Sequence, residues 1–350
     1  MSAADDLLLT AAVDRWIAAG ADLDAVEEHR IGLLVAHRLR ETGRPVPEEL
    51  AIDERDAQVL AATAPRVLED VRAAVEGPVI LVKGLEAAAV YPVPATRAGF
   101  GDLDVIVADA PGAQRRLIAA GFEEVGDPAD FVGLHHLRPL RRPGLPVLVE
   151  VHHRPKWVAW APAPGIDELA EAALPGRSGV EGVLRPAPEH HALILAAHSW
   201  SNVPLRRLRD LIDVHRVARE ADPALTAALA RGHGLGGVWQ TTRRAADWLI
   251  APEGRAPLPL RTWARGLRGA RDATVLENHL GRWTSPFWVR PPRAALADVG
   301  RVAAADLRPK AGEGWGAKAR RTALVARNLG RAQPDHDDAA ERLADPDRRV

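Results

Sequence analysis

The spacing of hydrophobic residues changes along this chain, and the change separates a strand-bearing middle region from helical regions on either side. Before residue 77 and after residue 187 hydrophobic residues recur every three or four positions, the period of amphipathic helices. Between residues 77 and 155, short β-branched runs alternate with helix-length segments bounded by glycine or proline. The pattern predicts a mixed α+β fold, in which a small central sheet is flanked by helices and followed by an all-helical C-terminal subdomain.

Proline- and glycine-rich breaks indicate how the chain is divided. We expect two helices within residues 5–41 and a third over 53–76, all packing against the core. The complete division is an N-terminal helical segment over residues 1–76, a sheet-bearing core over 77–155, a connector over 156–187, a helical subdomain over 188–332 and a disordered tail over 333–350.

Two carboxylates stand at the start of a β-branched run that covers residues 102–107. Residues two apart on a strand point to the same face, so Asp102 and Asp104 project side by side while Leu103 faces the core. Carboxylate oxygens are the ligands that hard divalent cations prefer. The pair therefore indicates a metal site on this strand.

A third carboxylate lies on another predicted strand, over residues 146–153. Alternation places Glu150 and His152 on one face of this strand and three valines on the other. Burying an unpaired glutamate is costly, so we interpret Glu150 as a partner of Asp102 and Asp104 at one metal site.

The segment before this strand carries two adjacent histidines and three arginines. We expect residues 131–137 to pair with 146–153 as a hairpin, joined by residues 138–144. The arginines of that joining segment fit a solvated turn or, alternatively, contacts to phosphate. We expect His136 and His152 to support the carboxylates or contact phosphate, and a zinc site built from the histidine pairs is the alternative.

Charge and composition narrow the classes of function. The chain has 46 lysines and arginines against 47 aspartates and glutamates, so it has no general attraction to nucleic acid. The absence of cysteine excludes disulfides, thiolate zinc sites and a cysteine nucleophile. An acidic N-terminus and the lack of an apolar run of about 20 residues argue against a signal peptide and a membrane partner. We therefore expect a cytoplasmic protein.

Several short motifs follow one another in the core. They are, in order, Lys83-Gly84, Tyr91-Pro92, Arg97, Gly101-Asp102-Leu103-Asp104 and Glu150-Val151-His152. In this order they resemble the family of uncharacterised bacterial nucleotidyltransferases, within the superfamily of DNA polymerase beta. That superfamily usually has Gly-Ser or Gly-Gly at the first turn, where this chain has Gly84-Leu85. A weaker resemblance through Leu208-Arg209-Asp210-Leu211 places Asp210 near the cleft.

The resemblance implies a polymerase-beta-like sheet with a helical partner domain and a cleft between them. The reaction would move a nucleoside monophosphate from a nucleoside triphosphate (NTP) to an acceptor hydroxyl and release pyrophosphate, with two Mg²⁺ ions. Asp102, Asp104 and Glu150 would be the catalytic metal ligands, and Glu150 would also accept the proton of the hydroxyl. The residues that would bind the nucleotide are Lys83, Gly84, Arg97, His136 and His152. Lys83 has an alternative role as the ion-pair partner of a carboxylate.

Two other functions fit the same residues. One is a nucleotide-binding or regulatory protein that has kept the fold and lost activity, and the other is a metal-dependent phosphohydrolase. The acceptor and the oligomeric state carry no signature in the sequence. The near-zero net charge favours a small molecule or a peptide over a large RNA as the acceptor.

Overall fold

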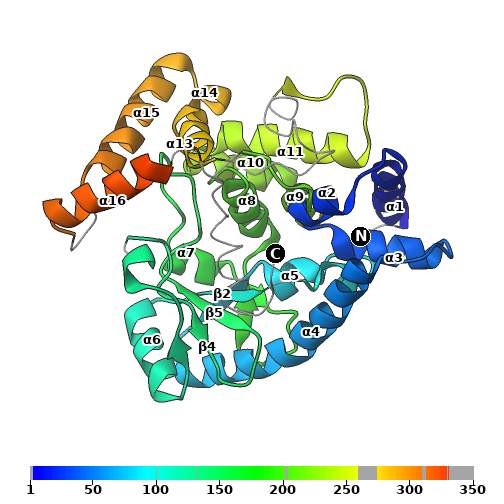
Figure 1. Ribbon diagram of the computed structural model, residues 1–350, viewed down its shortest axis with the longest axis horizontal. Helices are drawn as coiled ribbons and strands as arrows, with labels where there is room; N and C mark the ends of the chain where they lie inside the picture. Colours follow the sequence, from blue (N-terminus) through cyan, green and yellow to red (C-terminus); the bar gives the residue numbers. More distant parts are fainter. Residues whose placement is uncertain are drawn as a thin grey trace.

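The protein has a mixed sheet with helices on both sides (Figure 1), which confirms the predicted α+β class. The computed structural model describes residues 3–99, 101–131, 133–201, 204–258, 274–309, 313–328 and 330. Among these residues seven strands form one sheet. In spatial order they are β3 (Glu123–Glu124), β4 (Leu140–Arg141), β5 (Leu148–His152), β2 (Asp102–Ile106), β1 (Val79–Val82), β7 (Val183–Arg185) and β6 (Leu174–Pro175).

The three longest strands place the predicted carboxylates next to one another. β1 runs antiparallel to β2, and β2 runs parallel to β5. In this register Asp104 is the direct neighbour of Glu150, and Ile106 is the neighbour of His152. Because side chains of paired residues share a face, the side chains of Asp104 and Glu150 lie together.

The two faces of the sheet belong to different hydrophobic clusters. One face carries Leu81, Leu103 and Val149, which are packed in one cluster with α4 (Glu48–Ala74) and α6 (Ala110–Ala119). The other face carries Ile80, Val82 and Ile106, packed in a second cluster with α8 (Pro188–His198) and α9 (Leu208–Ala218). The carboxylates alternate onto this second face, which the helices α8 and α9 cover (Figure 1).

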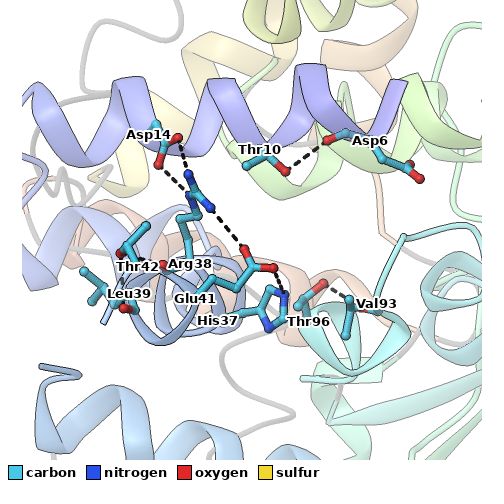
Figure 2. A network of polar contacts seen from close by, with 10 residues as sticks. All are labelled: Asp6, Thr10, Asp14, His37, Arg38, Leu39, Glu41, Thr42, Val93 and Thr96. Atoms are coloured by element: carbon cyan, nitrogen blue, oxygen red, sulfur yellow. Dashed lines mark hydrogen bonds and ion pairs between the residues drawn. The ribbon is translucent and has the colours of Figure 1, made fainter. Parts of the chain in front are cut away.

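Three helices form before residue 42, where the sequence predicts two within residues 5–41. They are α1 (Ala3–Ala18), α2 (Leu23–Glu28) and α3 (Gly32–Glu41). Arg38 of α3 bonds both carboxylate oxygens of Asp14 on α1, at 2.7 and 2.8 Å, and also bonds Glu41 (Figure 2). These groups are partly exposed, so the ion pair contributes at most about 1 kcal/mol. The buried contacts of α1 and α3 in the α8–α9 cluster hold the helices in place.

The elements that the structure describes after β7 are all helices, as the hydrophobic period of this region predicts. Beyond the sheet follow α10 (Pro223–Gly232), α11 (Gly236–Ile250), α13 (Val275–Thr284), α14 (Pro286–Val289), α15 (Pro292–Leu307) and α16 (Trp315–Asn328). Shorter helices occur earlier: α5 (Gly84–Ala88), η1 (Pro94–Arg97), η2 (Pro128–Phe131) and α7 (Ile166–Glu171). No helix in the described ranges has the length and apolarity that crossing a membrane requires. The tail predicted over residues 333–350 lies outside the described residues.

Two predictions placed strands of the sheet at the wrong positions in the sequence. Residues 131–137 do not form a strand among the described positions; Phe131 ends η2, and His136 makes an isolated bridge to His152. The antiparallel partner of β5 is β4, inside the expected joining segment, where the fully buried Leu140 packs in the α4–α6 cluster. The expected connector over 156–187 also supplies β6 and β7, and β7 extends the sheet beside β1.

Candidate functional site

A strained turn connects β1 to α5 at the edge of the site. Lys83 has φ 58° and ψ −146°, a backbone conformation that is uncommon for a residue with a side chain, and Gly84 follows at φ 42°. The Lys83 backbone N–H donates to Nε2 of His191 at 3.4 Å. Burial lowers the pKa of His191 to about 4, so this nitrogen is neutral and can accept. The turn brings the Lys83 ammonium to the strand that carries the aspartates.

Asp104 is the most enclosed of the predicted carboxylates, with 2% of its surface exposed. Its Oδ1 lies 3.2 Å from Nζ of Lys83 and 2.9 Å from Nε2 of His152. Burial by itself would raise the pKa of Asp104, but the charges of Lys83 and His152 hold it well below the usual range. Asp104 is therefore an anion at neutral pH, paired with Lys83 as the alternative role predicted for that residue requires.

His152 and Glu150 complete a compact group with Asp104. Nε2 of His152 lies 3.4 Å from Oε2 of Glu150. Burial opposes the charged imidazole, but contact with the two carboxylates raises the pKa of His152 to about 9. One ligand atom each from Asp104, Glu150 and His152 lies within 4.8 Å of the others, and this is a donor set that fits a divalent cation. His152 must lose its proton before its nitrogen can ligate a metal.

Further histidines lie near the group of Asp104, Glu150 and His152. Nδ1 of His136 is 3.8 Å from Oε2 of Glu150 and 2.7 Å from the Leu137 carbonyl oxygen. The ring centroids of His136 and His152 are 5.2 Å apart, and burial lowers the pKa of His136. His136 thus lies beside Glu150, and its role in supporting the carboxylates stays a prediction. Within the described part of the chain, the cluster that could hold a metal includes neither His135 nor His153, so it does not support the alternative of a zinc site built from the histidine pairs.

A pocket opens beside Asp104, where the sheet meets α8 and α9. Five of the predicted residues line it, whereas Glu150, His136 and His152 do not. Asp210, predicted to lie near the cleft, is also part of its wall. The full lining is Arg30, Lys83, Gly84, Arg97, Gly101, Asp102, Asp104, Leu195, His198, Arg209, Asp210 and Asp213.

Arg97 reaches the pocket as part of a buried network. Its Nε and Nη2 donate to the carboxylate of Asp213 at 2.9 and 2.7 Å, and the Tyr91 hydroxyl donates to the same carboxylate at 2.6 Å. Burial would raise the pKa of Asp213, but the paired Arg97 lowers it below the usual value. Arg97 therefore joins η1 to α9, and its Nη1 is the guanidinium nitrogen that makes no hydrogen bond to Asp213.

The arginines of the joining segment have partners near the surface. Arg138 bonds Glu124 at 2.7 Å, Arg142 lies 2.8 Å from Asp70, and Arg141 lies 3.9 Å from Glu123. None of the three lines the pocket. These contacts favour the interpretation of the three arginines as surface groups over the alternative of phosphate binding, although residues 140–141 form β4 and are not part of a turn.

Among the pocket residues to which the sequence interpretation gave no role are Arg30, His198 and Arg209. Arg30 comes from the corner between α2 and α3, a region without a chemical motif. Its backbone has φ 51°, which no pattern of hydrophobic residues reveals. Arg209 stands in the weak motif beside Asp210, which was the one available signal.

The comparisons with known proteins agree with this arrangement. A family model described as "Uncharacterised nucleotidyltransferase" matches residues 19–249 of the 350-residue chain. The matched range contains every residue of the pocket and of the Asp104–Glu150–His152 group. Searches of curated proteins and of solved structures gave no match.

Proposed function

We propose that this chain, which belongs to the uncharacterised nucleotidyltransferase family, transfers a nucleoside monophosphate from an NTP to an acceptor hydroxyl and releases pyrophosphate. The observation that carries the proposal is the position of Asp104 and Glu150 on neighbouring strands, beside a pocket that also holds Asp102 and several cationic side chains. Carboxylates and cations around one pocket suit a reaction at phosphorus, where positioning and charge stabilisation do most of the catalysis.

We assign the divalent cations, Mg²⁺ by preference, to the carboxylates of Asp102, Asp104 and Glu150. When bound, such ions neutralise the triphosphate and polarise the attacking hydroxyl. The protein holds Asp104 ionised in advance, because Lys83 and His152 compensate its charge. Lys83 and Gly84 lie at the pocket wall, where the ammonium and the exposed backbone can meet phosphate oxygens.

The proton of the acceptor hydroxyl needs a carboxylate that the substrate can reach. The sequence interpretation gave this role to Glu150, but Glu150 is 8% exposed and does not line the pocket. Asp102 does line it and is only half-buried. We therefore assign to Asp102 the role of accepting the proton of the acceptor hydroxyl. The hydroxyl oxygen bonds to the α-phosphorus, the bond between the α-phosphorus and the oxygen that bridges it to the β-phosphate breaks, and pyrophosphate leaves.

One observation favours a second candidate, a nucleotide-binding protein without transferase activity. Lys83 and His152 already neutralise the carboxylates, so the site is stable without a cation. In addition, Leu85 follows Gly84 where the superfamily has a small or hydroxyl-bearing residue. A protein of this kind would bind an NTP at the same pocket and leave it intact.

An assay with NTPs labelled in the α- or γ-phosphate separates these functions. The protein is incubated with Mg²⁺ or Mn²⁺ and a fractionated pool of small molecules and peptides. The transferase predicts α-label on an acceptor with release of pyrophosphate, and loss of both with Asp104→Asn. Asp56→Asn, an exposed aspartate of α4, is the matched control and should keep full activity. Binding without transfer would favour the inactive protein, and γ-label released as inorganic phosphate would favour a phosphohydrolase.

A further inference from the structure

Three arginines from distant parts of the chain line the same pocket as the aspartates. Arg30 comes from the corner between α2 and α3, Arg97 from the end of η1, and Arg209 from the first turn of α9. Guanidinium groups repel one another, so their convergence in one pocket requires compensating negative charge. We call Arg30, Arg97 and Arg209 the arginine cluster.

The corner that carries Arg30 is held firmly against α9. Nε of Arg206 donates to Oε1 of Glu28 at 2.6 Å, and the Arg209 backbone N–H donates to the His29 carbonyl oxygen at 3.3 Å. Between these contacts Arg30 adopts φ 51°, in the left-handed region that favours glycine. A non-glycine residue in this conformation is often retained for function, because the strain is not needed for folding.

Aspartates line the same pocket and offset the charge of the cluster, but two of its arginines keep buried N–H groups that find no acceptor among the described residues. Arg97 is paired with Asp213, yet its buried Nη1 has no hydrogen-bond partner among the described residues. Nη1 of Arg209 donates to the Gly99 carbonyl oxygen at 3.2 Å, whereas its buried Nε is unpartnered among the same residues. Burial and the nearby charges of Arg97 and Arg30 lower the pKa of Arg209 to about 10, so Arg209 remains a cation at neutral pH.

Buried N–H groups without acceptors, on residues that stay charged, favour an anion with several oxygens. Arginine is suited to phosphate because its planar fork can donate two parallel hydrogen bonds. The acidic residues Asp102 and Asp104 lie in the same pocket, so a bound polyphosphate could extend from the carboxylates towards the arginines.

We propose that Arg30, Arg97 and Arg209 form an anion subsite that binds the β- and γ-phosphates of the nucleotide and does not require a divalent cation. The identity of the anion as part of a nucleotide rests on the proposed transferase function. The subsite itself rests on the cluster, and it makes the N-terminal helices part of the nucleotide site.

The test measures binding of inorganic tripolyphosphate by calorimetry, with EDTA present to remove divalent cations. We expect the wild-type chain to bind, and Arg30→Gly to bind at least ten times more weakly. Glycine accepts φ 51° without strain, so the unfolding temperature of this variant should be unchanged or higher. An arginine with a purely structural role would instead give a lower unfolding temperature with unchanged affinity, and that result would overturn the proposal.

Further variants make the test specific. Arg209→Gln should also weaken binding at least tenfold, and Arg209→Lys should recover part of it because the charge returns. Arg141→Gln removes an arginine outside the pocket and is the matched control, expected to bind like the wild type. If Arg209→Gln does not fold, Arg30→Gly alone decides. Equal affinity in the wild type and Arg30→Gly, or no binding by the wild type, contradicts the subsite.

Competition shows whether the anion belongs to the nucleotide. Tripolyphosphate should raise the apparent Kd of an NTP, and simultaneous binding of both would overturn the assignment. Different results would contradict the proposed subsite and the proposed transferase function. Label transfer by a chain that does not bind tripolyphosphate would remove the subsite alone. Cluster-dependent binding by a chain that transfers no label would remove only the transferase.

Discussion

Asp213 is a single carboxylate that joins three parts of the structure. It accepts hydrogen bonds from Tyr91 and Arg97, and all three side chains are buried. Asp213→Asn should lower the free energy of unfolding by about 3–5 kcal/mol at pH 7, because the charge of Arg97 is left buried without a partner. Denaturant unfolding measures this, with Asp210→Asn on the same helix and only half-buried as the control. A loss below 1 kcal/mol would show that Arg97 finds another partner.

The same residue predicts how stability depends on pH. Burial alone would raise the pKa of Asp213, but Arg97 outweighs it and holds the pKa in the folded chain below the ordinary value of 3.8. Its contribution is therefore fully present above the unfolded pKa and is lost as the pH falls through the folded pKa. The difference in unfolding free energy between the wild type and Asp213→Asn should be constant above about pH 5 and shrink below about pH 4. A constant difference down to pH 3 would contradict the lowered pKa.

A substitution of Glu150 tests whether this carboxylate, which does not line the pocket, takes part in the cation site. Glu150→Gln keeps the shape and removes one of the two charges that raise the pKa of His152. We expect that pKa, followed by NMR of the imidazole, to fall below about 9. Nucleotidyl transfer should drop at least 100-fold, or about 2.7 kcal/mol of barrier. Transfer at the wild-type rate would remove Glu150 from the cation site, and an unchanged pKa of His152 would contradict the contact.

For single residues, the sequence predicted the carboxylates of the site better than its arginines. Asp104 and Glu150 lie on strands whose alternation fixes the side-chain direction, so their faces could be predicted. Their pairing with His152 and Lys83 follows from the register and the turn, which the sequence specifies less directly. Arg30 could not be predicted, because its position depends on a backbone conformation and on contacts of Glu28 and His29 with a helix far along the chain.

Two adjacent glycines at the start of α11 test how the C-terminal helices are attached. A Cβ at Gly237 would lie 2.0 Å from the Val289 carbonyl oxygen of α14, whereas a Cβ at Gly236 would meet only Cγ of Arg231 at 3.8 Å. Gly237→Ala must therefore displace α14, and we expect it to destabilise the chain by about 1–3 kcal/mol. Gly236→Ala should be neutral or stabilise by up to about 1 kcal/mol, the gain usual for alanine in a helix.

Thermal unfolding of the two alanine variants gives the measurement, and nucleotide binding is followed in parallel. Gly237 and Val289 lie away from the pocket, so the affinity for NTP should not change in either variant. Equal unfolding temperatures would show that α14 moves aside at no cost. A loss of NTP affinity confined to Gly237→Ala would show that α14 supports the pocket indirectly.

Whether an element could be predicted from the sequence depends on how long its hydrophobic pattern is. Helices such as α4, α8 and α11 are long enough for a full hydrophobic period. The sequence predicted α4 over residues 53–76 and placed α8 and α11 in a helical region, without the bounds that the structure gives them. β4 and β7 have two and three residues, so no alternation can develop. Their place in the sheet is decided by burial of Leu140 and by pairing with β1, both of which need the tertiary structure.

For the molecule as a whole, the pocket is the place where separate parts of the chain meet. The sheet contributes the aspartates, α9 contributes Arg209 and Asp213, and the N-terminal helices contribute Arg30. The α8–α9 cluster buries residues of α1, α3, α9 and α11 together, so these elements form one continuous core. A ligand that contacts all three contributors should therefore stabilise elements that are distant from one another in sequence.

Hydrogen exchange can show whether the ligand joins these parts. With tripolyphosphate in EDTA, we expect slower exchange of backbone amides at the corner between α2 and α3 and in the first turn of α9, because an anion on the arginine cluster holds both. In Arg30→Gly, protection should disappear at the corner and remain in part at α9, where Arg209 is still present. Arg141→Gln should give the wild-type pattern. Protection confined to β2 and α5 in the wild type would mean that the N-terminal helices support the fold and take no part in binding.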